Sequence, residues 1–157
     1  MEMRKLFLFL MFMTAIVTNA QTKSVVQEVR DYLHECGTFY IATVDGDRPH
    51  VRPFRVAEVY NGKLYIQTGK KKNVFKQMMA NPKFEITAVN PNGKGWIRVS
   101  GKLVNDDSRE VKAYVLDQNP ELKGMYSADD DNTAVLYITN GEAKFCSFTE
   151  PERDVKF

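Results

Sequence analysis

Beyond residue 20, the hydrophobic and polar positions along the chain predict a series of short strands joined by tight turns. The strand-like runs are rich in β-branched and aromatic residues and occupy residues 38–44, 50–60, 63–68, 83–89, 95–104 and the two halves of 133–148. Asn61–Gly62 is a strong hairpin signal, the segment NPNGKG at 90–95 predicts a second hairpin, and Asn140–Gly141 predicts the turn of a last one. Consecutive strands joined by hairpins indicate an antiparallel sheet.

Three stretches carry apolar residues at helical spacing and therefore predict helices. Residues 24–35 have Ser24 as a possible N-cap, with Gly37 just past the end. Residues 106–118 begin with acidic and hydroxyl side chains that can cap a helix. In residues 71–80, the expected apolar face consists of Val74, Phe75, Met78 and Met79, and the expected polar face of Lys72, Asn73, Lys76 and Gln77.

These elements together predict a mainly β protein. The expected architecture is an antiparallel β-barrel or sandwich with peripheral helices, rather than a parallel, doubly wound sheet. Pro53 falls within the predicted strand 50–60. Because proline has no N–H group, it indicates either a bulge or a position whose N–H needs no partner.

The first twenty residues differ from the rest of the chain. Arg4 and Lys5 precede an apolar run that is too short to span a bilayer comfortably, and small residues follow at Thr18 and Ala20. We expect residues 1–20 to be a cleaved signal peptide and residues 21–157 to form one domain, periplasmic or secreted and free of the membrane after cleavage. The alternative is a retained N-terminal extension on a cytoplasmic protein.

Composition and charge are ordinary for one globular domain. The chain has 157 residues, of which 43% are hydrophobic and 27% charged, and its net charge of +2 is too small to argue for a nucleic-acid partner. The run Lys70–Lys72 is therefore a local feature. Cys36 and Cys146 match no metal spacing, and two separate thiols are favoured over the disulfide that export would permit.

Several familiar motifs are excluded by single positions. A nucleotide-binding P-loop around Gly69 would need a glycine where Leu64 stands and a hydroxyl residue where Lys71 stands. Residues 129–132, with the sequence DDDN, lack the glycine and the final glutamate of a calcium-binding loop, and we interpret them as a solvated acidic loop. His34 and His50 belong to no cluster with metal-ligand spacing, so no metal site is predicted.

The remaining question is the purpose of three consecutive lysines before a helix. A helix that begins near Lys71 presents unpaired N–H groups and the positive end of its dipole, which suits a phosphate. Lys71 and Lys72 would add full charges there, and Arg52 on a neighbouring strand would add a third. The alternative is a charged helix end that is simply solvated.

A wider resemblance favours the phosphate interpretation. The segments ECGTFYIATVDGDRPHVRPF, GKLYIQTGKKKNVFKQMMANPKFEI, GWIRVSGKLV and LKGMYSADD resemble, in order, the pyridoxamine 5'-phosphate oxidase-like, FMN-binding split-barrel superfamily. The likeness is strongest to its small, nitroimidazole-resistance-type bacterial members and extends over nearly all of residues 25–157. It implies a six-stranded antiparallel split barrel that forms a homodimer, with two FMN molecules in clefts between the subunits.

The resemblance also assigns roles to residues. Arg52 and Pro53 open the strand that runs beside the ribityl chain and phosphate in the family. The segment Ile66, Gln67 and Thr68 matches the strand that lies along the flavin. The helix start formed by Lys71, Lys72 and Asn73 matches the phosphate-binding element. Trp96 falls where the family places a residue of the partner subunit against the flavin.

This sequence has no counterpart of the C-terminal segment whose Arg and His bind substrate in the true pyridoxamine phosphate oxidases, so that activity is not expected. No catalytic acid on the chain is required, because hydride transfer takes place at the flavin itself. We therefore expect an FMN-dependent oxidoreductase that reduces a small planar acceptor, such as a nitroaromatic or a quinone. The alternatives are a deazaflavin in the same cleft, or a non-enzymatic binder or carrier of flavin or haem.

Overall fold

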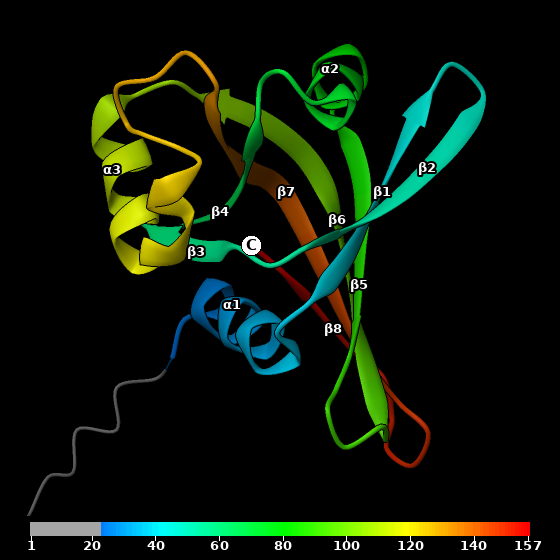
Figure 1. Cartoon of the computed structure of the whole chain (residues 1–157). Coiled ribbons are helices and arrows are strands. Elements are labelled where there is room, and N and C mark those ends of the chain that lie inside the picture. Colours follow the sequence, from blue (N-terminus) through cyan, green and yellow to red (C-terminus); the bar gives the residue numbers. More distant parts are fainter. Residues whose placement is uncertain (1–22) are drawn as a thin grey trace, which may run out of the picture.

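An eight-stranded antiparallel sheet forms the body of the protein (Figure 1). It is seen in a computed structural model that describes residues 23–157, so the predicted signal peptide at residues 1–20 lies outside the described residues. The strands are β1 (Phe39–Asp45), β2 (Arg48–Phe54), β3 (Ala57–Tyr60), β4 (Lys63–Gly69), β5 (Lys83–Val89), β6 (Gly95–Asp106), β7 (Thr133–Ser147) and β8 (Arg153–Lys156). The helices are α1 (Val25–Cys36), α2 (Asn73–Ala80), α3 (Arg109–Gln118) and the short 3-10 helix η1 (Pro120–Gly124). Within this described part, no helix has the length and apolar character needed to cross a membrane.

The sheet is a split barrel, because its two edge strands do not pair with each other. The strand order is β2-β1-β5-β6-β7-β4-β3, and β8 pairs with the part of β7 that β4 leaves free. Figure 1 shows α2 at one end of the sheet and α3 beside β3 and β4. The predicted mainly β, antiparallel split barrel is confirmed, with eight strands where six were expected.

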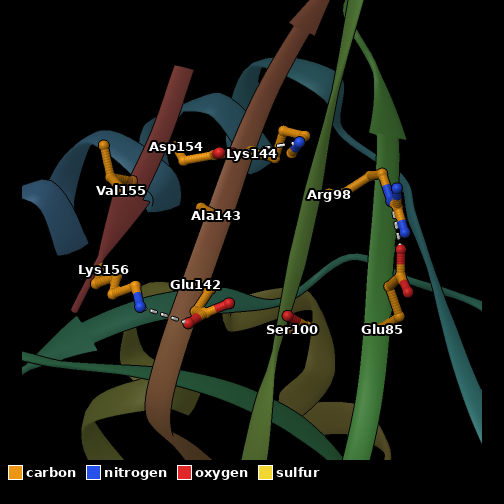
Figure 2. A pocket seen from close by; sticks show the side chains of 9 residues that line it. All are labelled: Glu85, Arg98, Ser100, Glu142, Ala143, Lys144, Asp154, Val155 and Lys156. Atoms are coloured by element: carbon orange, nitrogen blue, oxygen red, sulfur yellow. Dashed lines mark hydrogen bonds and ion pairs between the residues drawn. The ribbon is translucent and has the colours of Figure 1, made fainter. Parts of the chain in front are cut away.

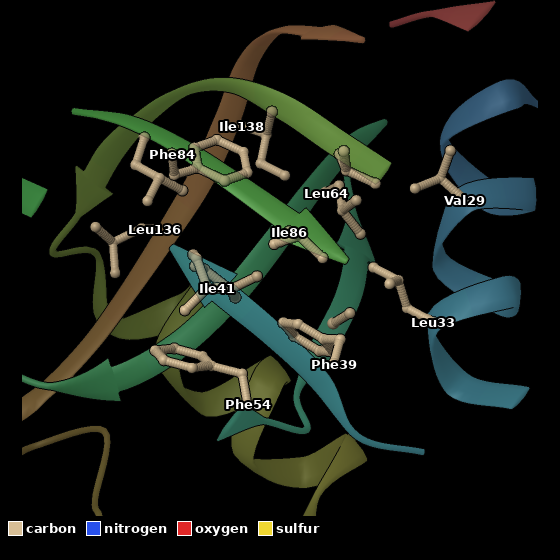
Figure 3. Close-up of a cluster of buried hydrophobic side chains, with 14 of the residues drawn as sticks. Val29, Leu33, Phe39, Ile41, Phe54, Leu64, Phe84, Ile86, Leu136 and Ile138 are labelled. Carbon is tan, nitrogen blue, oxygen red and sulfur yellow. The ribbon is translucent and has the colours of Figure 1, made fainter. Parts of the chain in front are cut away.

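The core lies between the curved sheet and α1 (Figure 3). Alternate residues of β1 and β5 point into it, among them Phe39, Ile41 and Ile86, which are fully buried. The predicted apolar face of α1 is confirmed, since Val29 and Leu33 are buried against the same core. This packing holds in place the strand ends that carry the polar side chains of the candidate site.

The predicted strand 50–60 is wrong, because two strands occupy this region. β2 ends at Phe54 and pairs with β1, whereas β3 begins at Ala57 and pairs with β4 at the opposite edge of the sheet. Residues 55 and 56 therefore carry the chain across the gap in the barrel. Pro53 is still paired opposite Tyr40, and it is tolerated because β2 is an edge strand with no neighbour on its other side.

The predicted hairpin at 133–148 is also wrong. β7 continues through Asn140–Gly141, and Asn140 takes a positive φ of 50° without reversing the chain. The paired strand is irregular at the same level, between Ser100 and Lys102. The Asn–Gly pair thus lies at an irregularity that both long strands share. A residue in the left-handed backbone conformation fits a β-bulge as well as a turn.

Candidate functional site

A cleft of about 470 Å³ opens beside the crossing between β2 and β3, within the usual size range of ligand pockets. Its walls come from the end of β2, the end of β4, the start of α2 and the segment that follows η1. The residues that line it are Thr38, Arg52, Pro53, Phe54, Arg55, Val56, Gln67, Thr68, Lys72, Val74, Leu122, Met125 and Tyr126. The cleft therefore combines three cationic side chains, Arg52, Arg55 and Lys72, with a largely apolar remainder.

The lysine run forms a tight turn before α2, which begins at Asn73 rather than at Lys71 as predicted. Two backbone N–H groups of the turn are held by one residue of a distant loop. The N–H of Lys70 donates to the carbonyl oxygen of Asn132 at 2.6 Å, and that of Lys71 donates to the Asn132 side-chain oxygen at 3.1 Å. Lys72 occupies the N-cap position of α2 without a side-chain cap, which leaves the helix start open to an external acceptor.

The loop that supplies Asn132 is more than the solvated acidic loop that we predicted. The carboxylate of Asp130 accepts N–H bonds from Ser127 at 2.8 Å, from Asn132 at 2.9 Å and from Thr133 at 2.5 Å. These N–H groups stabilise the charged form and hold the pKa of Asp130 at about 2, although partial burial works in the opposite direction. The loop is thus folded around Asp130 and braces the lysine turn.

The three lysines have different environments. Lys70 forms an ion pair with Asp107, with 2.6 Å between Nζ and Oδ1, and therefore has its own counter-charge. Lys71 is exposed and does not line the cleft. Lys72 does line it, with Nζ 5.8 Å from the centre of the Tyr126 ring. Only the last lysine of the run therefore faces the cleft.

Arg52 is the second cleft cation with a fixed position. Its guanidinium donates to Thr43 Oγ1 at 2.8 Å and to the side-chain oxygen of Gln77 at 2.9 Å. Burial lowers the pKa of Arg52 from its ordinary value of 12.5, but a guanidinium remains charged at neutral pH. No ion pair between residues 23 and 157 includes Arg52 or Lys72, so both charges lack a carboxylate partner in this part of the chain.

Gln77 corrects the predicted orientation of α2. We expected it on the outward polar face, but its side chain is only 7% exposed and is hydrogen-bonded to Thr43 and Arg52. Met79, expected on the apolar face, is 42% exposed. The helix is rotated relative to the prediction because a buried polar partner, Arg52, takes the place of an apolar contact.

Five of the nine predicted site residues line the cleft, namely Arg52, Pro53, Gln67, Thr68 and Lys72. Of the other four, Ile66 is fully buried in the core, and Lys71 and Asn73 are exposed at the helix start. Trp96 lies on β6, where it packs against Phe148 with 5.1 Å between ring centres, and does not line the cleft of its own chain.

Sequence reasoning missed the wall formed by Leu122, Met125 and Tyr126. Leu122 lies in η1 and the other two follow it, and no local pattern links them to the lysine turn about fifty positions earlier. The contact is nevertheless close, because a Cβ added to Gly69 would lie 3.2 Å from the Tyr126 ring. Gln77 could have been found, since Val74, Gln77 and Met78 share one helical face and a polar residue among buried neighbours needs a partner.

A second hollow, of about 530 Å³, lies on the outer face of β5 to β8 and is strongly charged (Figure 2). Its cations are all matched by carboxylates. Arg98 pairs with Glu85, and Lys156 pairs with Glu142 at 3.0 Å. Lys144 lies 3.1 Å from Glu152 and 3.6 Å from Asp154. This second hollow therefore offers no free positive charge to a ligand.

Comparison with known proteins agrees with this architecture. The family model described as pyridoxamine 5'-phosphate oxidase matches residues 25–147. A solved NimC/NimA family protein from Clostridium acetobutylicum is 48% identical, with 84% of this chain and 92% of that chain covered and a TM-score of 0.82. A search of the curated proteins found no match.

Two more distant solved structures share the fold. One is a pyridoxamine 5'-phosphate oxidase-related, FMN-binding protein from Nostoc punctiforme, 14% identical, with 81% of this chain and 86% of that chain covered and a TM-score of 0.59. The other is described as an F420 reductase, 18% identical, with 71% of this chain and 94% of that chain covered and a TM-score of 0.54.

The fold defines a protein of the split-barrel class. Within that class, the chain belongs to the pyridoxamine 5'-phosphate oxidase family, since the family model matches well over half of its length. The predicted likeness to the nitroimidazole-resistance-type members is confirmed by the NimC/NimA relative.

Proposed function

We propose that the cleft binds FMN and that the protein is an FMN-dependent oxidoreductase. The observation that carries this proposal is that Arg52, Lys72 and the uncapped start of α2 all border one cleft that also has a large apolar lining. Two positive charges without carboxylate partners, beside free helix N–H groups, suit a phosphate dianion. The run Lys70–Lys72 then has a function, in which Lys72 alone contacts the phosphate.

The apolar part of the lining suits the flat ring system of a flavin. Phe54, Val56, Leu122, Met125 and Tyr126 supply apolar surface, and Met125 is 69% exposed, so its apolar side chain is available to a ligand. Gln67 and Thr68 supply polar groups between this surface and the cationic end. A polar end for the phosphate and an apolar surface for the ring fit the two parts of FMN.

The bound flavin would supply the redox chemistry, by accepting and passing on a hydride or electrons. The residues of this chain would bind the phosphate, orient the ring and exclude water from one of its faces. Because these roles require no acid or base on the chain, the proposed substrates are small planar acceptors such as nitroaromatics or quinones. They would stack on the ring face that the cleft leaves open.

Two other ligands remain as alternatives to FMN. A deazaflavin also joins a flat ring to a phosphate, and one structure that shares this fold is described as an F420 reductase. Haem is less well supported. The chain has two histidines, and neither His34 nor His50 lines the cleft to serve as an axial ligand.

The absorption spectrum of the purified protein tests the proposal. Flavin bands, followed by release of a molecule with the mass of FMN, would support it. A deazaflavin band or a haem Soret band would replace FMN by that cofactor. A colourless protein that does not bind added FMN would contradict the proposal.

We also propose that the protein is a homodimer. The outer face of the sheet carries exposed apolar side chains, including Tyr40, Val51 and Val89, that pairing of two copies would cover. In the family arrangement, Trp96 of one copy would then lie against the flavin of the other. Sedimentation at micromolar concentration tests the dimer, and quenching of Trp96 fluorescence by added FMN tests the placement. A monomer with unchanged fluorescence would contradict both.

Export is a separate proposal that rests on the sequence of residues 1–20. A Sec substrate crosses the membrane unfolded, so FMN would have to be captured by the cleft after export. N-terminal sequencing of the native protein decides the matter. A start at Gln21 is expected, whereas a start at Met1 in the soluble cytoplasmic fraction would contradict export and leave the flavin proposal intact.

A further inference from the structure

Arg52 is held by a buried polar network whose other members do not line the cleft. Thr43 on β1 is 2% exposed and Gln77 on α2 is 7% exposed, and both contact the guanidinium. Thr43 Oγ1 also lies 2.8 Å from the Gln77 side-chain oxygen. The three side chains therefore form a closed triangle between two elements of the core and one edge strand.

The chemistry of the three groups fixes how they are oriented. A guanidinium can only donate, so both Thr43 Oγ1 and the Gln77 oxygen must accept from Arg52. The Thr43 hydroxyl hydrogen is then directed to the same Gln77 oxygen. The Gln77 amide nitrogen lies 3.5 Å from Asp45 Oδ2, at the outer limit of a hydrogen bond, which favours the same orientation.

Both partners that hold Arg52 are neutral. Arg52 itself is half-buried, and an arginine held among buried groups is ordinarily matched by a carboxylate. A carboxylate at position 77 would hold the guanidinium equally well but would cancel its charge. Neutral acceptors fix the position of Arg52 and leave its full charge available to a ligand in the cleft.

We infer that Gln77, assisted by Thr43, is the positioning residue that presents Arg52 as an uncompensated cation, and that it makes the cleft select a phosphorylated flavin over an uncharged one. The inference rests on the proposed function, since it assigns the phosphate to Arg52. It extends that function to two residues that do not line the cleft.

The decisive variant is Gln77→Glu, which keeps the size of the side chain and the hydrogen bonds to Arg52 but adds a counter-charge. Asp45 is the carboxylate that faces position 77, so the change is also made in an Asp45→Asn background, where the asparagine amide can donate to the new carboxylate. Lys76→Ala is the matched control, because it changes the net charge by the same amount on the exposed side of α2. Thr43→Val removes one acceptor of Arg52 without adding charge.

FMN and riboflavin are titrated into each variant, and thermal unfolding is followed in parallel. We expect Gln77→Glu to weaken FMN about tenfold or more, because the charge-assisted bond from Arg52 to phosphate is lost. Riboflavin, which has no phosphate, should change less than about twofold, and thermal stability should not fall. Thr43→Val should weaken FMN in the same selective manner, and Lys76→Ala should leave both ligands unaffected.

The outcomes separate this inference from the proposed function. If Gln77→Glu binds FMN within about twofold of the parent, the inference is wrong while flavin binding stands. Equal losses of FMN and riboflavin, together with a lower melting temperature, would reduce Gln77 to a purely structural role and also overturn it. A parent protein that binds no flavin would overturn the proposed function and this inference together.

Discussion

Two hollows of similar volume in residues 23–157 differ in how their charges are balanced. On the outer face of β5 to β8, Arg98, Lys144 and Lys156 each face a carboxylate (Figure 2). In the cleft beside α2, Arg52 is held by neutral side chains, and Lys72 has no ion-pair partner in the described chain. Size therefore does not distinguish the two hollows, whereas charge balance does.

The difference indicates which hollow is built for a ligand. Paired charges on a strand surface form a solvated ladder that links neighbouring strands, and each exposed pair contributes little to stability. Fixing Arg52 with two buried side chains costs more folding free energy, because Thr43 and Gln77 must be desolvated to hold it. At the cleft, both side chains that hold Arg52 are themselves buried and neutral, so this desolvation leaves the arginine charge unmatched.

The largest effect is expected when Arg52 and Lys72 are removed together. The double change Arg52→Ala and Lys72→Ala should weaken FMN about a hundredfold or more, because two charge-assisted contacts to phosphate are lost. Isothermal titration of FMN measures the loss. A double variant that binds FMN as tightly as the parent would place the phosphate elsewhere and remove the basis of the comparison.

A smaller effect, about tenfold, is expected when single lysines of the run are replaced, and it should differ between Lys70 and Lys72. Lys72→Ala should weaken FMN about tenfold, whereas Lys70→Ala should change it less than about twofold, because Asp107 already neutralises Lys70. The two variants carry the same change in net charge, so each controls for the other. The reverse order of effects would mean that Lys70, not Lys72, turns toward the ligand.

Acidification should lower the stability of the protein through Asp130, which braces the lysine turn. Its pKa is about 2 in the folded protein, below the ordinary value of 3.8, so the stability it contributes is present above about pH 4 and is lost as the pH falls toward 2. Thermal unfolding of Asp130→Ala across this range should show a lower melting temperature at neutral pH and a flatter decline on acidification. Asp131→Ala, an exposed neighbour, serves as the control and should follow the parent.

The smallest effect is expected on the other side of the comparison. Arg98→Ala and Lys144→Ala should each leave the affinity for FMN within about twofold of the parent, because both cations are paired and lie outside the cleft. The same titration measures this. A clear loss of FMN from either variant would show that the paired face also takes part in binding, for example across a dimer.

The sequence predicted the fold class because its signals are local. Strand alternation in β1 and β5, the caps of α1 and the Asn61–Gly62 turn all act over a few residues, and the structure contains each of them. The two wrong elements also have local signals, but their meaning depends on distant partners. Asn140–Gly141 has the residues of a hairpin turn, yet pairing with β6 and with the C-terminal residues, where the N–H of Gly141 donates to the Phe157 carbonyl at 2.9 Å, keeps β7 extended.

The candidate site was predicted in part for the same reason. Arg52 and Lys72 stand out by charge in otherwise strand-like or turn-like sequence, whereas the roles of their neighbours depend on contacts between elements. Gln77 was assigned to solvent because it is polar, and its burial follows only from the presence of Arg52 across the core. The apolar wall at Leu122 to Tyr126 depends on the path of the chain after α3, which no periodicity encodes.

The central claim is that the unmatched charges of the cleft hold a phosphate, and the parent protein tests it without any mutation. FMN and riboflavin share the same ring system and differ by the phosphate alone, so the ratio of their dissociation constants isolates the contribution of that group. The account predicts that FMN binds about a hundredfold or more tightly than riboflavin, with the preference shrinking as salt is added. Equal affinity for the two flavins, at any salt concentration, would contradict it.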